Sequence, residues 1–243
     1  MESELMQNLR GLNTTSVIDW QRIETFVGYG NMFAPVVFIG VEEGLSNEGS
    51  LQEDLRIRSG FEPVMDLKDA HAGITDTERL FDPRHTKCQR TWRPMCDLML
   101  RRSGEKPTLE TRNRYQASEL GRKNGHTLLC ELLPYPSKNA SAWIYPGRFE
   151  SREAYRKAIV PQRIRLLKNT IGEAKRELIV CYGKGDWKNF EVLFEGAELR
   201  NHGRYRVGSS NGTRIVFATH FSAREFNTDA ELEALAGAAL ARL

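Results

Sequence analysis

The chain has 243 residues, of which 40% are hydrophobic and 28% are charged, so it can bury a core of ordinary size, which argues against general disorder. Its 35 basic and 32 acidic side chains give a formal net charge of +3, too small to indicate a polyanionic partner by itself. Four cysteines without a CxxC pair predict a reducing, cytoplasmic compartment with no disulfide, metal or other cofactor. Residues 1–12 lack the apolar centre of a secretion signal, and no apolar run reaches the roughly 18 residues that span a bilayer.

Four short apolar runs, each followed by a glycine or a polar turn, are predicted to form strands. They are PVVFIG, HTLLCELLP, ELIVCYG and TRIVFATH, at residues 35–40, 126–134, 177–183 and 213–220. Their apolar residues do not alternate with polar ones, which is typical of strands that are covered on both faces. The pattern therefore predicts an α/β fold of three layers, α/β/α, with a parallel sheet in the middle layer.

The intervals between these runs contain the predicted helices. The longest covers 151–177, where isoleucine and leucine recur at near-helical spacing and Pro161 is expected to break or kink the helix. Segments 186–196 and 229–243 are predicted to form two more helices. The long polar interval at about 45–125 is interpreted as an insertion of helices or a mobile segment on one side of the sheet.

Polar residues gather where the predicted strands end, which is the edge of a parallel sheet that holds ligands. The four strand ends read GVEEG, CELLPYPSKN, CYGKGDW and HFSAREFN, at residues 40–44, 130–139, 181–187 and 220–227. In order and spacing they resemble the motifs of the uracil-DNA glycosylase superfamily over most of residues 36–227. The resemblance implies one domain, residues 1–243, with a four-stranded parallel sheet between helices and a flipped nucleobase held at the strand ends.

The resemblance gives the first strand end a catalytic role. Glu42 matches the position that orients the attacking water and stabilises the positive charge that develops on the sugar. Glu43, which stands where the family has a proline, is a second catalytic candidate. Gly40 and Gly44 are expected to let the backbone approach the base and a phosphate closely. The alternatives are a solvated loop acid or a helix-cap partner for the carboxylates, and turn geometry for the glycines.

The third and fourth strand ends supply the remaining candidates. His220 is expected to donate a hydrogen bond to the base carbonyl that gains charge as the base leaves, and the alternative is a structural histidine. Phe221 replaces a second proline of the family pattern. Lys184, Ser222 and Arg224 are expected to contact DNA phosphates. A sheet-edge charge, a helix cap and a solvated surface charge are the respective alternatives.

Glu131 lies in the second strand end, where the family has an amide that reads the base. An ionised carboxylate only accepts hydrogen bonds, so Glu131 is expected to disfavour the carbonyl groups of uracil. The exocyclic amino group of a cytosine-like or adenine-like base would suit it better. Protonation of the carboxyl by burial, or pairing with a neighbouring basic side chain, would remove this preference.

These residues together predict a hydrolase that excises a flipped, modified, non-uracil base from DNA by cleaving the N-glycosidic bond without a metal. The DNA partner is single-stranded or otherwise modified in this interpretation, and no membrane partner is expected. Two alternatives stay open. The chain could be a nucleic-acid-binding module that kept the fold and lost the chemistry, or an enzyme that acts on free nucleosides or nucleotides.

Overall fold

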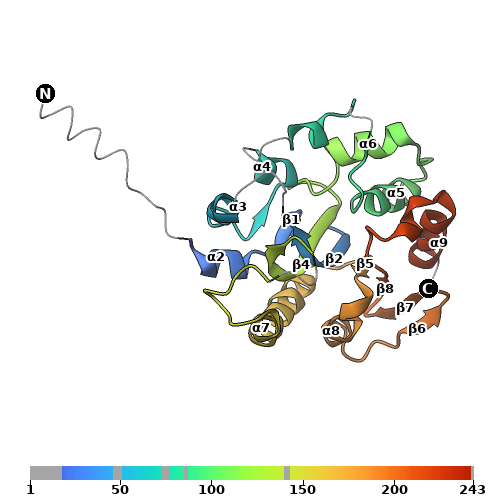
Figure 1. Ribbon diagram of the computed structural model, residues 1–243. Helices are drawn as coiled ribbons and strands as arrows, with labels where there is room; N and C mark the ends of the chain where they lie inside the picture. The colour runs from blue at the N-terminus through green and yellow to red at the C-terminus, as the bar shows by residue number, and fades with distance from the viewer. Residues whose placement is uncertain (1–17, 46–50, 73–76, 85–86, 140–142, 242–243) are drawn as a thin grey trace, which may run out of the picture.

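A computed structural model of the chain describes residues 18–45, 51–72, 77–84, 87–139 and 143–241. The described residues form an α/β fold around an eight-stranded mixed sheet (Figure 1). The strands are β1 (Gly28–Gly30), β2 (Val36–Gly44), β3 (Val64–Met65), β4 (Thr127–Ser137), β5 (Leu178–Tyr182), β6 (Arg200–His202), β7 (Tyr205–Ser210) and β8 (Thr213–Ala218). Segment 1–12, in which the sequence shows no secretion signal, lies outside the described residues.

The strands follow the order β3-β1-β4-β2-β5-β8-β7-β6 across the sheet. The central strands β4, β2, β5 and β8 are mutually parallel, and they are the apolar runs of the sequence. Strand β1 runs antiparallel to β4, and β7 runs antiparallel to both β8 and β6. The four predicted strands are therefore present and mutually parallel, but the prediction of a sheet with only four, all-parallel strands is wrong, because the sheet has eight strands and is mixed. The additional strands were missed because they are short and lack a continuous apolar run.

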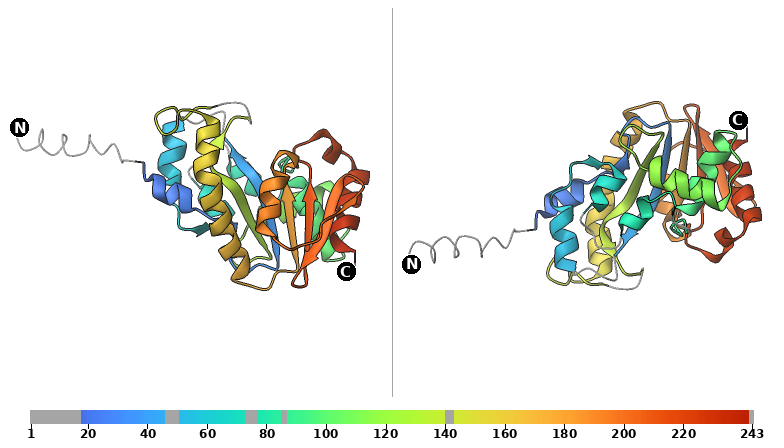
Figure 2. Two further views of the ribbon diagram at one scale, coloured as in Figure 1. Left: turned by 90° about the horizontal axis from the view of Figure 1, so that it is seen from below. Right: turned by 90° about the horizontal axis from the view of Figure 1, so that it is seen from above.

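Helices cover both faces of the sheet (Figure 2). The helices α2 (Trp20–Thr25), α7 (Arg152–Gly172) and α8 (Trp187–Leu193) pack on one face, and α4 (Leu67–His71), α5 (Arg93–Arg102) and α9 (Asp229–Leu240) pack on the other. The remaining elements are α3 (Leu51–Arg58), α6 (Leu109–Ser118) and the 3-10 helices η1 (Glu78–Phe81), η2 (Lys184–Asp186) and η3 (Arg224–Asn227). Within the described ranges, no helix has the length and apolar content that crossing a bilayer requires.

A break or a kink was predicted at Pro161, and the break is wrong, because helix α7 continues through this residue. Its first turn is fixed by Ser151, whose hydroxyl accepts a hydrogen bond of 3.1 Å from the backbone N–H of Ala154. Pro161 lies on the exposed face of the helix, where water can bond the carbonyl that lacks its usual N–H partner. The helix therefore reaches the edge of the sheet in one piece and brings its N-terminal arginines to the strand ends.

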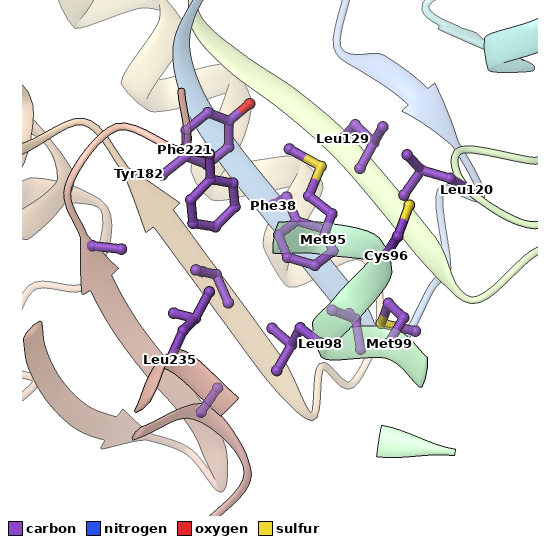
Figure 3. Packing of buried hydrophobic residues seen from close by; sticks show 14 of the residues in the cluster. Phe38, Met95, Cys96, Leu98, Met99, Leu120, Leu129, Tyr182, Phe221 and Leu235 are labelled. Atoms are coloured by element: carbon purple, nitrogen blue, oxygen red, sulfur yellow. The ribbon is translucent and has the colours of Figure 1, made fainter. Parts of the chain in front are cut away.

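Both faces of β2 are buried, which explains its continuous apolar sequence. Phe38 packs against α5 and α9, whereas its neighbours Val37 and Ile39 belong to the cluster formed with α7 and α8. All of these strand residues are fully buried. Figure 3 shows Phe38 beside Met95 of α5 in the first of these clusters. The apolar run ends at Ile39, so the residues that follow it emerge at the carboxyl edge of the sheet.

Candidate active site

A cavity of about 940 Å³ opens at the carboxyl ends of the central parallel strands. Its wall contains Glu42 and Glu43 at the end of β2, Glu131 in β4, Tyr182 at the end of β5 and His220 after β8. Parallel strands end at the same edge of a sheet, so residues that are far apart in the sequence meet here. The structure thus brings the predicted catalytic and base-reading side chains into one cavity.

Glu42 is fixed by an arginine at the start of α7. The Nη2 atom of Arg152 donates hydrogen bonds to both carboxylate oxygens of Glu42, at 2.5 and 2.6 Å. Burial raises the pKa of Glu42, and the Arg152 pair opposes that increase. The side chain of Glu42 is only 11% exposed, so Glu42 is not a solvated loop acid. It is an ion-paired carboxylate that faces the cavity.

Glu43 is held by a different set of partners, because successive side chains of a strand point to opposite faces. The Nη2 atom of Arg58 lies 2.6 Å from Oε2 of Glu43, and the hydroxyl of Tyr29 donates a hydrogen bond of 3.0 Å to the same oxygen. Burial by itself would raise the pKa of Glu43, but the Arg58 guanidinium and the Tyr29 hydroxyl hold it below its ordinary value. Glu43 is therefore an ionised carboxylate at neutral pH.

The side chain of Glu131 extends over the neighbouring strand β2, and its carboxyl bonds a tyrosine instead of a basic side chain. Strand β2 lies between β4 and β5, yet the hydroxyl of Tyr182 in β5 donates a hydrogen bond of 2.9 Å to Oε1 of Glu131 in β4. Among the described residues, no group bonds the other oxygen, Oε2, which is buried. Arg163 donates to the backbone carbonyl of Glu131, at 2.7 Å, and not to its carboxyl.

Burial therefore raises the pKa of Glu131 well above its ordinary value, and the nearby carboxylate of Glu43 raises it further. The shift favours the protonated form of this carboxyl. In that form Oε2 carries the proton, because Oε1 accepts the hydrogen bond from Tyr182. The expected preference for an amino-bearing base assumed an ionised Glu131, and the direction of this pKa shift removes that assumption.

The two glycines of the first strand end have different surroundings. A Cβ atom at position 40 would lie 2.2 Å from Oε2 of Glu131 and 2.5 Å from the hydroxyl oxygen of Tyr182. Gly40 therefore makes room for these two side chains, and its close approach to a base stays a prediction. At Gly44, which lines the cavity, an added Cβ would meet no described atom within 4 Å.

His220 is oriented by Ser222, two residues further along the chain. The backbone N–H of Ser222 donates to Nδ1 of His220 at 3.2 Å, and the Ser222 hydroxyl lies 2.8 Å from the same nitrogen. Because an amide N–H can only donate, Nδ1 is unprotonated and the neutral ring carries its proton on Nε2. Burial lowers the pKa of His220, so the ring is neutral at neutral pH. His220 then offers an N–H donor, while the Ser222 hydroxyl already contacts the imidazole.

Two of the three residues predicted to bind DNA line the cavity, and the third lies outside it. Lys184 in η2 lines the cavity, and its Nζ lies 5.7 Å from the ring centroid of Trp187. Ser222 lines the cavity as well. Arg224 in η3 is exposed and lies outside the cavity wall. Lys184 is thus placed to meet a ligand at the cavity, whereas Arg224 can only contact a ligand that extends beyond it.

Several residues of the site were missed by sequence reasoning. They are Tyr29 of β1, Arg58 of α3, His71 of α4 and Arg152 of α7. The ring centroids of His71 and Trp92 lie 5.8 Å apart, and both residues line the cavity. The positions of the missed residues depend on how helices far apart in the sequence pack at the sheet edge, so no local pattern marks them. Tyr182 could have been found, because it ends an apolar run directly before Gly183.

No protein-family model matches the chain, and no curated protein matches it at a significant level. Within the described part of the chain, no group of three or more His, Cys, Asp or Glu side chains could hold a metal ion. The chemistry of the cavity is therefore the basis for assigning a function. It combines the carboxylates of Glu42 and Glu43 with the neutral imidazole of His220 and the carboxyl of Glu131, whose pKa is raised by burial.

Proposed function

We propose that the protein is a hydrolase that cleaves the N-glycosidic bond of a flipped nucleobase in DNA. The observation that supports this most directly is the meeting of Glu42, Glu131 and His220 in one cavity at the ends of parallel strands. These are the side chains on which the resemblance to the uracil-DNA glycosylase superfamily rests. A base stacked in a duplex could not reach a cavity of this kind, so base flipping is part of the proposal.

The charges of the cavity match the charge that develops during cleavage. As the bond breaks, the sugar gains positive charge and the base gains negative charge. The carboxylates of Glu42 and Glu43 stabilise the sugar, and Glu42 also orients the attacking water. The Nε2–H of His220 and the carboxyl of Glu131 donate to the departing base. Arg152 holds the Glu42 carboxylate in a fixed position through two hydrogen bonds, so Glu42 acts by position and charge.

The identity of the base depends on the protonation of Glu131. A protonated Glu131 donates through Oε2, so a carbonyl oxygen or a ring nitrogen of the base becomes a suitable partner. An ionised Glu131 would instead select an exocyclic amino group. A modified base stays within this proposal, and a substrate panel has to contain both carbonyl-bearing and amino-bearing bases.

The experiment is a release assay on oligonucleotides that carry uracil, hypoxanthine, cytosine, adenine or a modified pyrimidine, in which alkali converts each abasic site into a strand break. We expect Glu42→Gln and His220→Ala to slow base release by about 10²–10⁴-fold, the range for one acid–base group, with DNA affinity nearly unchanged. Glu198→Gln is the matched control, because Glu198 is exposed and lies next to the edge strand β6.

Each other outcome points to one of the alternatives. Salt-dependent DNA binding without release of any base would overturn the enzymatic proposal and favour a binding module. Release from free nucleosides but not from oligonucleotides would overturn DNA as the substrate. Equal rates for the parent, Glu42→Gln and His220→Ala would show that the catalytic site lies elsewhere.

A further inference from the structure

Two cysteines lie in contact at the beginning of α5. The Sγ atoms of Cys88 and Cys96 are 4.0 Å apart, and both residues are free thiols. Cys88 is half-buried, whereas Cys96 is fully buried. The other two cysteines, Cys130 and Cys181, lie on β4 and β5 with β2 between them. Two strand spacings are about 9.6 Å, which is too far for a disulfide.

We propose that Cys88 and Cys96 form a redox-modification site, at which a peroxide converts the two thiols into an intramolecular disulfide. The peroxide transfers one oxygen to the sulfur of Cys88, which gives a sulfenic acid and releases water. The sulfur of Cys96 then attacks the sulfur of Cys88, and the sulfenic hydroxyl leaves as water with the proton of the Cys96 thiol. The two thiols supply the two electrons that reduce one O–O bond.

The environment of the two sulfurs sets this order of events. Burial raises the pKa of Cys96 well above its ordinary value, so its thiolate is rare and a peroxide in solvent does not reach it. Cys88 is the less buried of the two residues, and its thiol donates a hydrogen bond of 3.1 Å to Oε1 of Gln116. Oxidation therefore begins at Cys88, and Cys96 resolves the sulfenic acid.

Formation of the disulfide has a consequence for the cavity. The sulfur atoms must approach from 4.0 Å to about 2.0 Å, and Cys96 is held in a helix within the core beside Met95 (Figure 3). The displacement therefore falls on Cys88 and the residues next to it. Gln89 donates its backbone N–H to the same Gln116 oxygen, at 2.7 Å, and both Gln89 and Trp92 line the cavity. Oxidation thus moves part of the cavity wall.

The test is oxidation of the full-length protein with hydrogen peroxide, followed by alkylation of the remaining thiols under denaturing conditions and peptide mapping. We expect the parent to lose two of its four thiols and the mass of two hydrogens, and to yield one disulfide peptide that joins Cys88 to Cys96. Dithiothreitol should restore both thiols. Cys88→Ser and Cys96→Ser should form no disulfide, while Cys130→Ser, the matched control, should behave like the parent.

A sulfinic or sulfonic acid at Cys88 without a disulfide, or a disulfide between other cysteines, would overturn the proposal. The coupling to the cavity is measured separately, and it does not depend on the proposed base-release activity. We expect the tryptophan fluorescence to change upon oxidation, and we expect this change to be lost in Cys88→Ser and in Trp92→Phe. A mapped disulfide with no change in fluorescence would overturn the coupling alone.

Discussion

The carboxyl of Glu131 occupies the space that a side chain at Gly40 would take. The two residues are paired neighbours on β4 and β2, and a Cβ atom at position 40 would lie 2.2 Å from Oε2 of Glu131. The missing side chain lets the carboxyl pass over β2 and reach the hydroxyl of Tyr182 on β5, at 2.9 Å. Gly40 in the first strand end therefore leaves the space that Glu131 in the second strand end occupies, so the two motifs form one structural unit.

Gly40→Ala tests this dependence. We expect a loss of about 1–3 kcal/mol in the free energy of unfolding, because the added methyl group must displace buried side chains. Gly44→Ala is the matched control and should change stability by less than about 0.5 kcal/mol, since its Cβ would meet open space. Urea unfolding followed by circular dichroism measures both. Equal losses of stability in the two variants would mean that the Glu131 side chain moves away from the added methyl group without a cost in free energy.

A second prediction concerns the pH dependence of Glu131. Its raised pKa means that the folded protein binds this proton more tightly than the unfolded chain. The stabilising contribution is present below the unfolded pKa of about 4.3 and is lost as the pH rises toward the folded value. Glu131→Gln keeps the shape and has no proton to lose, so its stability relative to the parent should increase with pH.

Urea unfolding of the parent and of Glu131→Gln at pH 5 and pH 8.5 measures this difference. Glu198→Gln serves as the exposed control and should leave the pH profile of the parent unchanged. A stability difference between the parent and Glu131→Gln that stays constant across the pH range would show that Glu131 titrates as an ordinary carboxylate in the folded protein.

A third prediction concerns the ion pair of Arg58 and Glu43. Arg58→Met should destabilise the fold by about 3–5 kcal/mol, because it leaves the Glu43 carboxylate buried without its cationic partner. The pKa of Glu43 should rise in this variant, so the loss should be greater at high pH than at low pH. Arg56→Met is the control in the same helix, since its pair with Glu53 is exposed and its loss should leave stability unchanged within error. Thermal unfolding of the parent, Arg58→Met and Arg56→Met at two pH values measures these differences in stability.

The central strands could be predicted from the sequence because both of their faces are buried. Residues 36–39 are apolar without interruption, which is a strong local signal. The outer strands carry no such signal: β3 has two residues, and β6, Arg200–His202, is polar and exposed. These strands pair through backbone hydrogen bonds with a neighbouring strand, and the position of that strand is a property of the tertiary structure.

The same distinction applies to the cavity. Glu42, Glu131 and His220 could be assigned to one site because strands of equal direction end at one edge. Arg152, which fixes Glu42, comes from a helix that continues through Pro161, where the sequence predicted a break or a kink. The sequence left the protonation of Glu131 open, because the pKa of the carboxyl depends on which groups surround it.

The last prediction follows from the separate positions of Lys184 and Arg224. Lys184 lines the cavity and Arg224 lies exposed outside it, so a DNA strand whose base enters the cavity can meet both. Each neutralised phosphate contributes about 0.9 to the slope of log K against log salt concentration, so each single alanine variant should reduce the slope by about that amount. Arg200→Ala is the control, because Arg200 is 84% exposed on the edge strand β6. Fluorescence anisotropy with a labelled oligonucleotide at several salt concentrations gives the slopes. An equal reduction of the slope for Arg200→Ala would mean that DNA binds the general positive charge of the protein. The predicted path of the DNA strand over the cavity would then be wrong.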